Sequence, residues 1–242
     1  MNETFTQWNE SLLIDGKPDE YEVKGLLQKN GIPCPKGVRL LPSQTLSIST
    51  ESVEPKAPSS SPSEAEVHVT FPGPYVVKVC SGEVLHKTEH GGVSLNVDKA
   101  SLTTTVEEMR ARFHGSPVLV ERQLEPVGPE FILGALTDPD FGLSVMAGAG
   151  GILTELYRDV TFRLAPLSEK EALDMLQELT VSPVLEGYRN LDLDREALAK
   201  IITAVGALAE AAGPLFGSLD LNPLVYTKQG WRALDAKLVW EK

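Results

Sequence analysis

The segment from Tyr75 to Val93, YVVKVCSGEVLHKTEHGGV, combines an apolar run with groups that could bind phosphate. A lysine within an apolar strand, here Lys78, is costly unless its ammonium group leaves the strand or meets an anion. The loop that follows offers a cation, backbone N–H groups and a titratable imidazole, which together could hold a polyphosphate and accept a phosphoryl group. The alternative is an edge-strand lysine with an ordinary glycine turn. The candidate residues of the loop are His86, Lys87, Gly91 and Gly92.

A second group of polar residues lies near the end of the chain, in SLDLNPLVYTKQGWRALDAKL. Asp220 and Asn222 are two residues apart, so on a strand both point to one face, and we expect Asp235 on a neighbouring antiparallel strand. Carboxylate and amide oxygens that converge from paired strands suit Mg²⁺, which keeps waters and shares phosphate oxygens. The alternative is a hairpin whose polar residues face water.

Two glutamates could recognise an adenosine. Glu121 follows the apolar run PVLV, and Glu130 precedes FILGA. One could accept a hydrogen bond from the base and the other from ribose hydroxyls, although solvated carboxylates at strand ends are the simpler alternative. Arg158 and Arg163, on either side of VTF, could neutralise phosphate or pair with acidic residues.

Several common signatures are absent from the sequence. There is no G-x-x-x-x-G-K-[ST] motif, and the run Gly148–Gly151 lacks the final glycine of a dinucleotide fingerprint. Neither H-E-x-x-H nor G-x-S-x-G is present. The usual markers of P-loop, zincin and α/β-hydrolase chemistry are therefore missing.

Composition excludes further classes of protein. The chain has 242 residues and a formal net charge of −12, which argues against binding to nucleic acid or to anionic membranes. Two cysteines are too few for a disulfide framework. The polar start has no signal-peptide pattern, and no run approaches the roughly 18 apolar residues of a membrane span. We expect a reduced, cytoplasmic protein.

The candidate groups must be positioned by helices and strands, and the sequence predicts that these alternate irregularly. Irregular alternation favours an α+β (α/β) fold over one doubly wound sheet. Between residues 43 and 63, eight serines and three prolines predict a mobile surface excursion. Asp19, and Ser168 with Glu171, are typical helix-start residues. The pattern predicts helices over residues 19–30, 104–115, 168–179 and 194–212, and strands over 38–41, 74–80, 93–97, 117–121, 131–137, 143–147, 219–226 and 232–239.

These blocks, in this order, resemble the ATP-grasp β subunit of the ADP-forming acyl-CoA synthetases, in particular the acetate-type enzymes. The blocks are EYEVKGLLQKNGIPCPKG, VVKVCSGEVLHKTEHGGV, TDPDFGLSVMAGAGGILTELYRDVTFRLAPL and LDLNPL. The last block is also similar to the succinyl-CoA synthetase β subunit. The resemblance implies an ATP-grasp fold of two lobes with the nucleotide between them: a core lobe (residues 19–37 and 121–242), a lid lobe (38–120) and an N-terminal extension (1–18).

The resemblance also implies roles for the candidate residues. Lys78 and the 86–92 loop would bind the phosphates of ATP or ADP, with Glu121 near the adenine and Glu130 on the ribose. Asn222 and Asp235 would be Mg²⁺ ligands, Asp220 would be catalytic, and His86 would relay the phosphoryl group. Glu89 stands where the family commonly has aspartate and His90 where it has a small apolar residue, so His90 could compete with His86.

The implied enzyme needs a partner, because the chain leaves no room for a CoA-binding module, which a separate α subunit would supply in a hetero-oligomer. The reaction would be acyl-CoA + ADP + phosphate ⇌ carboxylic acid + ATP + CoA. Two alternatives stay open. The chain could be a stand-alone ATP-grasp ligase that activates another carboxylate, or a regulatory nucleotide-binding subunit without catalysis.

Overall fold

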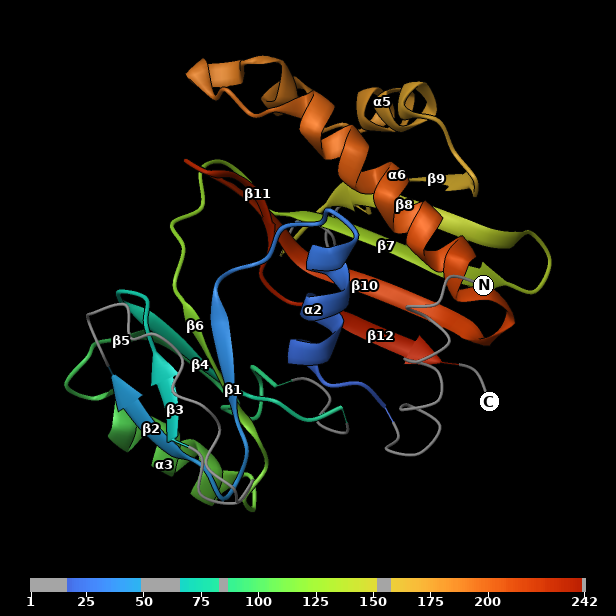
Figure 1. Ribbon diagram of the computed structural model, residues 1–242. Helices are drawn as coiled ribbons and strands as arrows, with labels where there is room; N and C mark the ends of the chain where they lie inside the picture. The colour runs from blue at the N-terminus through green and yellow to red at the C-terminus, as the bar shows by residue number, and fades with distance from the viewer. Residues whose placement is uncertain (1–16, 49–65, 83–86, 152–157, 241–242) are drawn as a thin grey trace. The chain divides into compact units, whose positions relative to one another are not determined.

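The computed structural model describes residues 17–48, 66–82, 87–151 and 158–240 (Figure 1). The chain divides into two compact units, one of residues 1–34 with 125–242 and the other of residues 35–124. The expected lid lobe was residues 38–120. Its ends fall within a strand pair of the second unit, where Gly37 pairs with Glu121. The expected extension 1–18 lies almost wholly outside the described residues.

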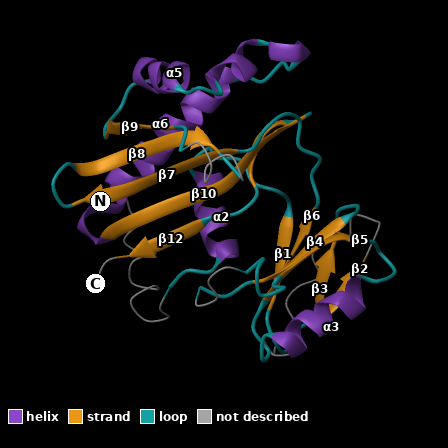
Figure 2. Ribbon diagram, turned by 180° about the vertical axis from the view of Figure 1, so that it is seen from behind, coloured by secondary structure: helices purple, strands orange, loops and turns teal. Residues whose placement is uncertain are grey.

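The larger unit is a six-stranded sheet with helices on one face. The strands are β7 (Phe131–Asp138), β8 (Gly142–Ala149), β9 (Val160–Leu164), β10 (Phe216–Thr227), β11 (Gly230–Ala233) and β12 (Lys237–Trp240). Their order is β11-β10-β7-β8-β9, and β12 also pairs with β10. Helix α6 (Arg195–Ala212) crosses in front of the sheet in Figure 1 and lies behind it in Figure 2. Helices α2 (Glu20–Lys29) and α5 (Glu169–Glu178) contribute to the same core.

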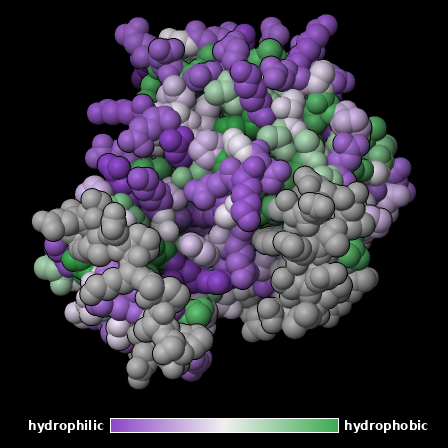
Figure 3. Space-filling view, viewed as in Figure 1, coloured by the Kyte–Doolittle hydropathy of each residue, from purple (hydrophilic) through white to green (hydrophobic). Residues whose placement is uncertain are grey.

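Local sequence explains where these helices begin. Asp19 caps α2 in a capping box with Glu22, and Ser168 caps α5 in a capping box with Glu171. The side chain of Asp194 accepts a hydrogen bond from the N–H of Ala197 at the start of α6. The 3-10 turns Ser182–Glu186, Tyr188–Asn190 and Gly213–Leu215 connect these helices to the rest of the unit. The upper part of the face in Figure 3, over α5 and the start of α6, is mostly hydrophilic.

The sequence predicts no segment apolar enough for a membrane span, but helix α6 meets that criterion by length and composition. The stretch Arg195–Leu215 has a mean hydropathy of 1.4 over its most apolar window and is long enough to span a membrane. Half of that window is buried inside the protein, where Ile202, Val205 and Leu208 pack into the core. An apolar stripe of this kind is what a core helix needs to cover a sheet, and by itself it is weak evidence for a membrane span.

The smaller unit is a four-stranded antiparallel sheet in the order β1-β6-β4-β5, covered on one face by helix α3 (Leu102–Arg112). Its strands are β1 (Gly37–Leu40), β4 (Tyr75–Val79), β5 (Val93–Val97) and β6 (Val118–Arg122). Val77, Val79, Val118 and Val120 face the helix. Helix α3 begins earlier than predicted and has no side-chain cap, because Ser101 bonds back to Asp98.

Two short strands correct the predicted excursion at residues 43–63. Residues Thr45–Ile48 form β2, which pairs in parallel with β3 (Glu66–Val69). Leu46, Ile48 and Val67 pack against the core of the smaller unit. The burial of these apolar side chains stabilises the two strands. Residues 49–63 of the predicted excursion lie outside the described residues.

Candidate functional site

Lys78 lies within β4, and its side chain is buried against a carboxylate. The Nζ atom is 2.9 Å from Oε2 of Glu121, and the two side chains are 9% and 3% exposed. Their proximity follows from strand register: Val76 pairs with Glu121 and Lys78 with Leu119, so both charged side chains lie on the sheet face that points away from α3. Within the smaller unit, the structure therefore brings together two residues that the sequence assigned to different parts of a nucleotide.

Gly37 makes room for this pair. A Cβ atom on Gly37 would lie 2.9 Å from Cγ of Glu121 and 3.2 Å from the carbonyl oxygen of Val120. The glycine is paired with Glu121 across β1 and β6. Gly37 was not among the residues predicted from the sequence, although a glycine inside a strand often marks a close approach of neighbouring groups.

The loop after β4 folds into a tight turn at its second half. The N–H of Gly91 donates to the carbonyl of Thr88, and the N–H of Gly92 donates to the carbonyl of Lys87 at 2.6 Å. The carbonyl of Gly92 accepts from the N–H of Val79, which ties the turn to the end of β4. Both glycine N–H groups are therefore used within the turn in this conformation, and the role of Gly91 and Gly92 in binding phosphate stays a prediction.

The remaining loop residues differ in exposure. Glu89 and His90 are exposed, whereas Lys87 is half-buried. The guanidinium of Arg112, at the end of α3, donates to the carbonyl of Gly91 at 2.7 Å. His86, the expected phosphoryl relay, lies outside the described residues.

In the larger unit, Asp220 and Asn222 share the face of β10 opposite the helices. Leu219 and Leu221 alternate with them and are buried in the core, so strand periodicity places both polar side chains on the exposed face. Asp220 pairs with Lys237 of β12 on one side and with Gly134 of β7 on the other.

Asp235 is not on a strand as expected, because β11 ends at Ala233 and β12 begins at Lys237. Both strands pair with β10 in one common register, which places position 235 across from Asn222. The N–H of Ala236 donates to Oδ1 of Asp235 at 2.8 Å. The link between β11 and β12 therefore carries Asp235 beside the strand that bears the other two oxygen donors.

The electrostatics of Asp220 reflect this neighbourhood. Its pKa is raised above the ordinary value, first because surrounding protein atoms displace part of its hydration and second because the Asp235 carboxylate is near. Lys237 acts in the opposite direction. Two carboxylates that disfavour each other's charge form a place where a cation would be stabilised.

The donor set fits magnesium. Asp220, Asn222 and Asp235 offer only oxygen atoms, and Mg²⁺ typically uses one or two carboxylates and completes its shell with waters and phosphate oxygens. Among the residues that the structure describes, no group of three or more His, Cys, Asp or Glu could form a metal site by itself. An ion that shares its coordination with a phosphate substrate is consistent with so few carboxylates.

Glu130 lies just before β7, against a glycine turn. Its carbonyl accepts from the N–H of Gly150, and a Cβ atom on Gly151 would lie 2.6 Å from its Oε2 atom. The expected ribose-binding glutamate thus belongs to the larger unit, whereas Glu121 belongs to the smaller one. Of the two arginines weighed as phosphate ligands, Arg163 pairs with Glu178 of α5.

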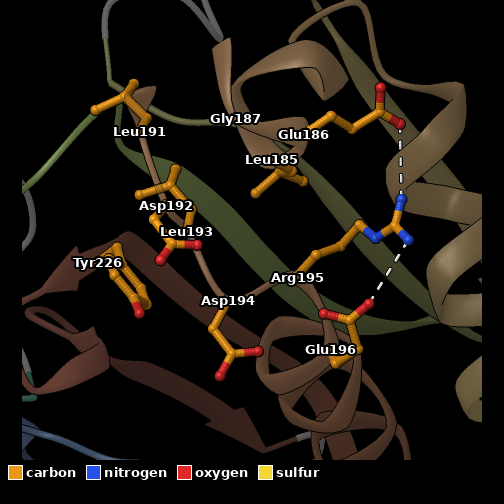
Figure 4. A pocket seen from close by; sticks show the side chains of 10 residues that line it. All are labelled: Leu185, Glu186, Gly187, Leu191, Asp192, Leu193, Asp194, Arg195, Glu196 and Tyr226. Carbon is orange, nitrogen blue, oxygen red and sulfur yellow. Dashed lines mark ion pairs between the residues drawn. The ribbon is translucent and has the colours of Figure 1, made fainter. Parts of the chain in front are cut away.

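A pocket of about 640 Å³ lies elsewhere in the larger unit, where α6 begins (Figure 4). Arg195 extends between Glu186 and Glu196 at 3.6 Å from each, and Tyr226 lines the wall. None of the residues expected from the sequence to bind nucleotide or metal lines it. Four of its ten lining residues are acidic and one is basic, an excess of negative charge that disfavours phosphate.

Residues 15–239 match the ATP-grasp domain family. The chain is 36% identical over 177 residues to the β subunit of acetate–CoA ligase [ADP-forming] I of Pyrococcus furiosus, covering 69% of this chain and 75% of that one. It is 31% identical over 245 residues to the β subunit of the type II enzyme of the same organism, covering 95% of both.

A solved structure gives the same picture. The dinucleotide forming acetyl-coenzyme A synthetase 1 of Ca. Korarchaeum cryptofilum superposes with a TM-score of 0.73 at 27% identity, over 98% of this chain and 100% of that one. That protein was solved with coenzyme A and Mg-AMPPCP, and its phosphohistidine segment points towards the nucleotide binding site. The ATP-grasp fold expected from the sequence is confirmed.

Proposed function

The chain belongs to the ATP-grasp family, together with the β subunits of ADP-forming acetate–CoA ligases, and we propose that it binds the nucleotide in such an enzyme. The observation that carries the proposal is the buried Lys78 ammonium group, which sits in an apolar strand of a chain that matches one of these subunits over 95% of both lengths. The reaction is acyl-CoA + ADP + phosphate ⇌ carboxylic acid + ATP + CoA.

In this proposal Lys78 binds the phosphates of ADP or ATP. Phosphoryl transfer depends mainly on positioning and on stabilising the charge of the transferred group. The carboxylate of Glu121, 2.9 Å away, holds the ammonium group in place before the nucleotide arrives. Glu121 and Glu130 also remain candidates for contacts with the adenosine part.

The proposed magnesium ligands are Asn222 and Asp235, with Asp220 beside them. When bound, Mg²⁺ would supply charge neutralisation on the phosphates. The protein's own contribution is to present Asp220 and Asn222 on the exposed face of β10, with Asp235 across from Asn222. We also propose that Asp220 is catalytic. It lies beside the metal ligands and its pKa is raised, and perturbed pKa values are common among catalytic groups.

The phosphoryl group would reach ADP through a histidine. We assign this role to His86, since neutral imidazole is nucleophilic near pH 7. The α-type partner would bind CoA and carry the acyl-phosphate chemistry. Support for a partner comes from relatives named as β subunits and from the phosphohistidine segment of the Korarchaeum protein.

The proposal can be tested with the purified chain and ATP labelled on its γ-phosphate. We expect base-stable, acid-labile label on the protein in the presence of Mg²⁺, and loss of that label in the His86→Asn variant. His90→Asn is the matched control, because His90 is exposed in the following turn and should retain the label. Nucleotide binding, measured by calorimetry, should survive in both variants.

Three results would contradict parts of the proposal. Label that persists in His86→Asn and disappears in His90→Asn would move the relay to His90. Turnover of a carboxylate by the chain alone would favour a stand-alone ligase. Tight nucleotide binding without any phosphoryl transfer, even with a CoA-binding partner present, would favour a regulatory subunit.

A further inference from the structure

Helix α2 buries an ion pair that the proposed chemistry does not use. Lys24 and Glu20 lie one helical turn apart, with Nζ and Oε1 separated by 2.7 Å, and their side chains are 5% and 0% exposed. Removing two charges from water costs several kcal/mol per ion unless further hydrogen bonds compensate. A buried pair of this kind calls for an explanation in what else the two residues contact.

Lys24 makes a second contact, with a residue 210 positions further along the chain. Its Nζ atom donates to the carbonyl of Leu234 at 2.7 Å. Leu234 lies in the link between β11 and β12, immediately before Asp235. The ammonium group of Lys24 is thus bonded to the residue that immediately precedes Asp235, a proposed magnesium ligand.

The chemistry of the sheet explains why this carbonyl needs a donor. Position 234 lies across from Pro223 in the register that β10 shares with β11 and β12. The N–H of Leu234 donates to the carbonyl of Pro223 at 2.9 Å. The return bond of an antiparallel pair cannot form, because proline has no N–H group. Lys24 donates to the Leu234 carbonyl the hydrogen bond that Pro223 cannot donate.

The same link is held at its start as well. The N–H of Ala233 donates to the carbonyl of Pro33, in the segment that follows α2. Helix α2 and the segment after it therefore contact two successive residues, Ala233 at the end of β11 and Leu234 in the link. No strand is assigned at residues 234–236, and there the Lys24 bond to the Leu234 carbonyl adds to the bond from the Leu234 N–H to Pro223.

We propose that Lys24 is a positioning residue for the metal site: held by Glu20, it fixes the Leu234 carbonyl and thereby sets Asp235 across from Asn222. The inference rests on the proposed role of Asp235 as a ligand. Residues that orient metal ligands typically change metal affinity by about 10- to 100-fold when they are replaced.

The test uses the double variant Glu20→Gln/Lys24→Met, which removes both charges and so leaves no buried carboxylate without its cation. The matched control is Lys29→Met, at an exposed lysine in the last turn of the same helix. If the double variant does not fold, Glu20→Gln/Lys24→Gln replaces it, since glutamine keeps a polar group but is one bond shorter than lysine.

Three measurements separate positioning from general stability. In the protein without metal or nucleotide, we expect amide exchange in residues 233–236 to be about tenfold faster or more in the double variant, and unchanged in the control. The Mg²⁺ concentration for half-maximal nucleotide binding should rise by roughly tenfold. Nucleotide affinity in EDTA should stay within about twofold of the control.

Each other result overturns the inference. Unchanged amide exchange would show that Lys24 does not hold the link. Faster exchange with an unchanged Mg²⁺ requirement would show that the link does not set the metal site, and equal losses with and without Mg²⁺ would show a merely structural role. If the wild-type chain binds no nucleotide, the proposed function fails, and amide exchange still decides whether Lys24 holds the link.

Discussion

The ammonium group of Lys78 lies 2.9 Å from the carboxylate of Glu121, and both side chains are buried on the same face of the smaller sheet. The pair joins β4 to β6, two strands that also share a backbone ladder. A buried lysine that already has an anionic partner is fixed in position before any substrate binds. Binding a phosphate then requires little reorganisation of the side chain, which is the advantage of a preorganised site.

Breaking this pair should separate stability from binding. Lys78→Met leaves the Glu121 carboxylate buried without that cation, and we expect a loss of about 3–5 kcal/mol in the free energy of unfolding. The double variant Lys78→Met/Glu121→Gln should recover most of that loss but should not recover nucleotide binding. Chemical denaturation and calorimetry measure the two quantities. Nucleotide binding by the double variant at the wild-type level would remove Lys78 from the phosphate site.

Gly37 offers a subtler perturbation of the same pair. In Gly37→Ala the new Cβ atom would lie 2.9 Å from Cγ of Glu121, so the glutamate must shift. We expect a loss of about 1–3 kcal/mol in stability and weaker nucleotide binding. The measurement is calorimetry with ADP, together with thermal unfolding.

The matched control is Gly25→Ala in α2, where the new Cβ atom would meet nothing within 4 Å beyond its chain neighbours and the backbone of its own helix. Alanine is the better helix former, so this variant should be more stable by roughly 0.5–1 kcal/mol and should bind nucleotide normally. Equal nucleotide affinities in the two variants would show that the position of Glu121 does not matter for binding.

The pKa of Asp220 predicts a pH dependence in the metal-free protein. A carboxyl group whose pKa is raised on folding stabilises the protein below its unfolded pKa, and that contribution is lost as the pH rises through the folded pKa. We therefore expect Asp220→Asn to be more stable than wild type at neutral pH. The difference should disappear below about pH 4, where both forms are uncharged.

The size of this effect should be small, below about 1 kcal/mol, because water screens a side chain that is open to solvent. Thermal unfolding from pH 3 to 8 in EDTA is the appropriate measurement, with Asp140→Asn in the exposed turn after β7 as a control. Added Mg²⁺ should reverse the order by stabilising wild type over Asp220→Asn. A variant that is less stable than wild type at neutral pH in EDTA would contradict the prediction.

Much of the fold could be predicted because the relevant signals are local. Helix α6 is a long amphipathic stripe that begins at an aspartate cap and ends at Gly213, and α5 begins with a capping box. Strands β4 and β5 lie within the strands predicted at residues 74–80 and 93–97. Patterns of this kind depend on residues within one or two turns of each other, so tertiary contacts do not need to be known.

The missed elements depend on distant partners. Strand β2 lies in a serine-rich stretch and is ordered by parallel pairing with β3. Strand β9 presents Phe162 and Leu164 on its exposed side, so its pattern does not resemble a strand with one buried face. Local composition and periodicity were therefore misleading at these positions.

The geometry of the candidate site also depends on contacts between distant parts of the chain. The sequence identified Lys78 and Glu121 individually, but their contact depends on the register between β4 and β6. It placed Asp235 on a strand, whereas the chain leaves the ladder at residues 234–236, opposite Pro223. Lys24 carries a weak signal that was available: a lysine between the apolar residues Val23 and Leu26, with a glutamate one turn earlier.

The turn after β4 provides the last prediction. A Cβ atom on Gly92 would lie 2.8 Å from Cγ1 of Val79 and 2.9 Å from the carbonyl oxygen of Lys87, which is backbone and cannot move without opening the turn. We expect Gly92→Ala to lose about 1–3 kcal/mol in stability and to weaken ATP binding more than AMP binding, because the turn follows the strand that carries Lys78. Calorimetry with both nucleotides measures the difference, and Glu108→Ala, at an exposed position of α3 outside the turn, should change neither affinity. Equal losses for ATP and AMP would mean that the turn supports the smaller unit as a whole and does not act on the terminal phosphates.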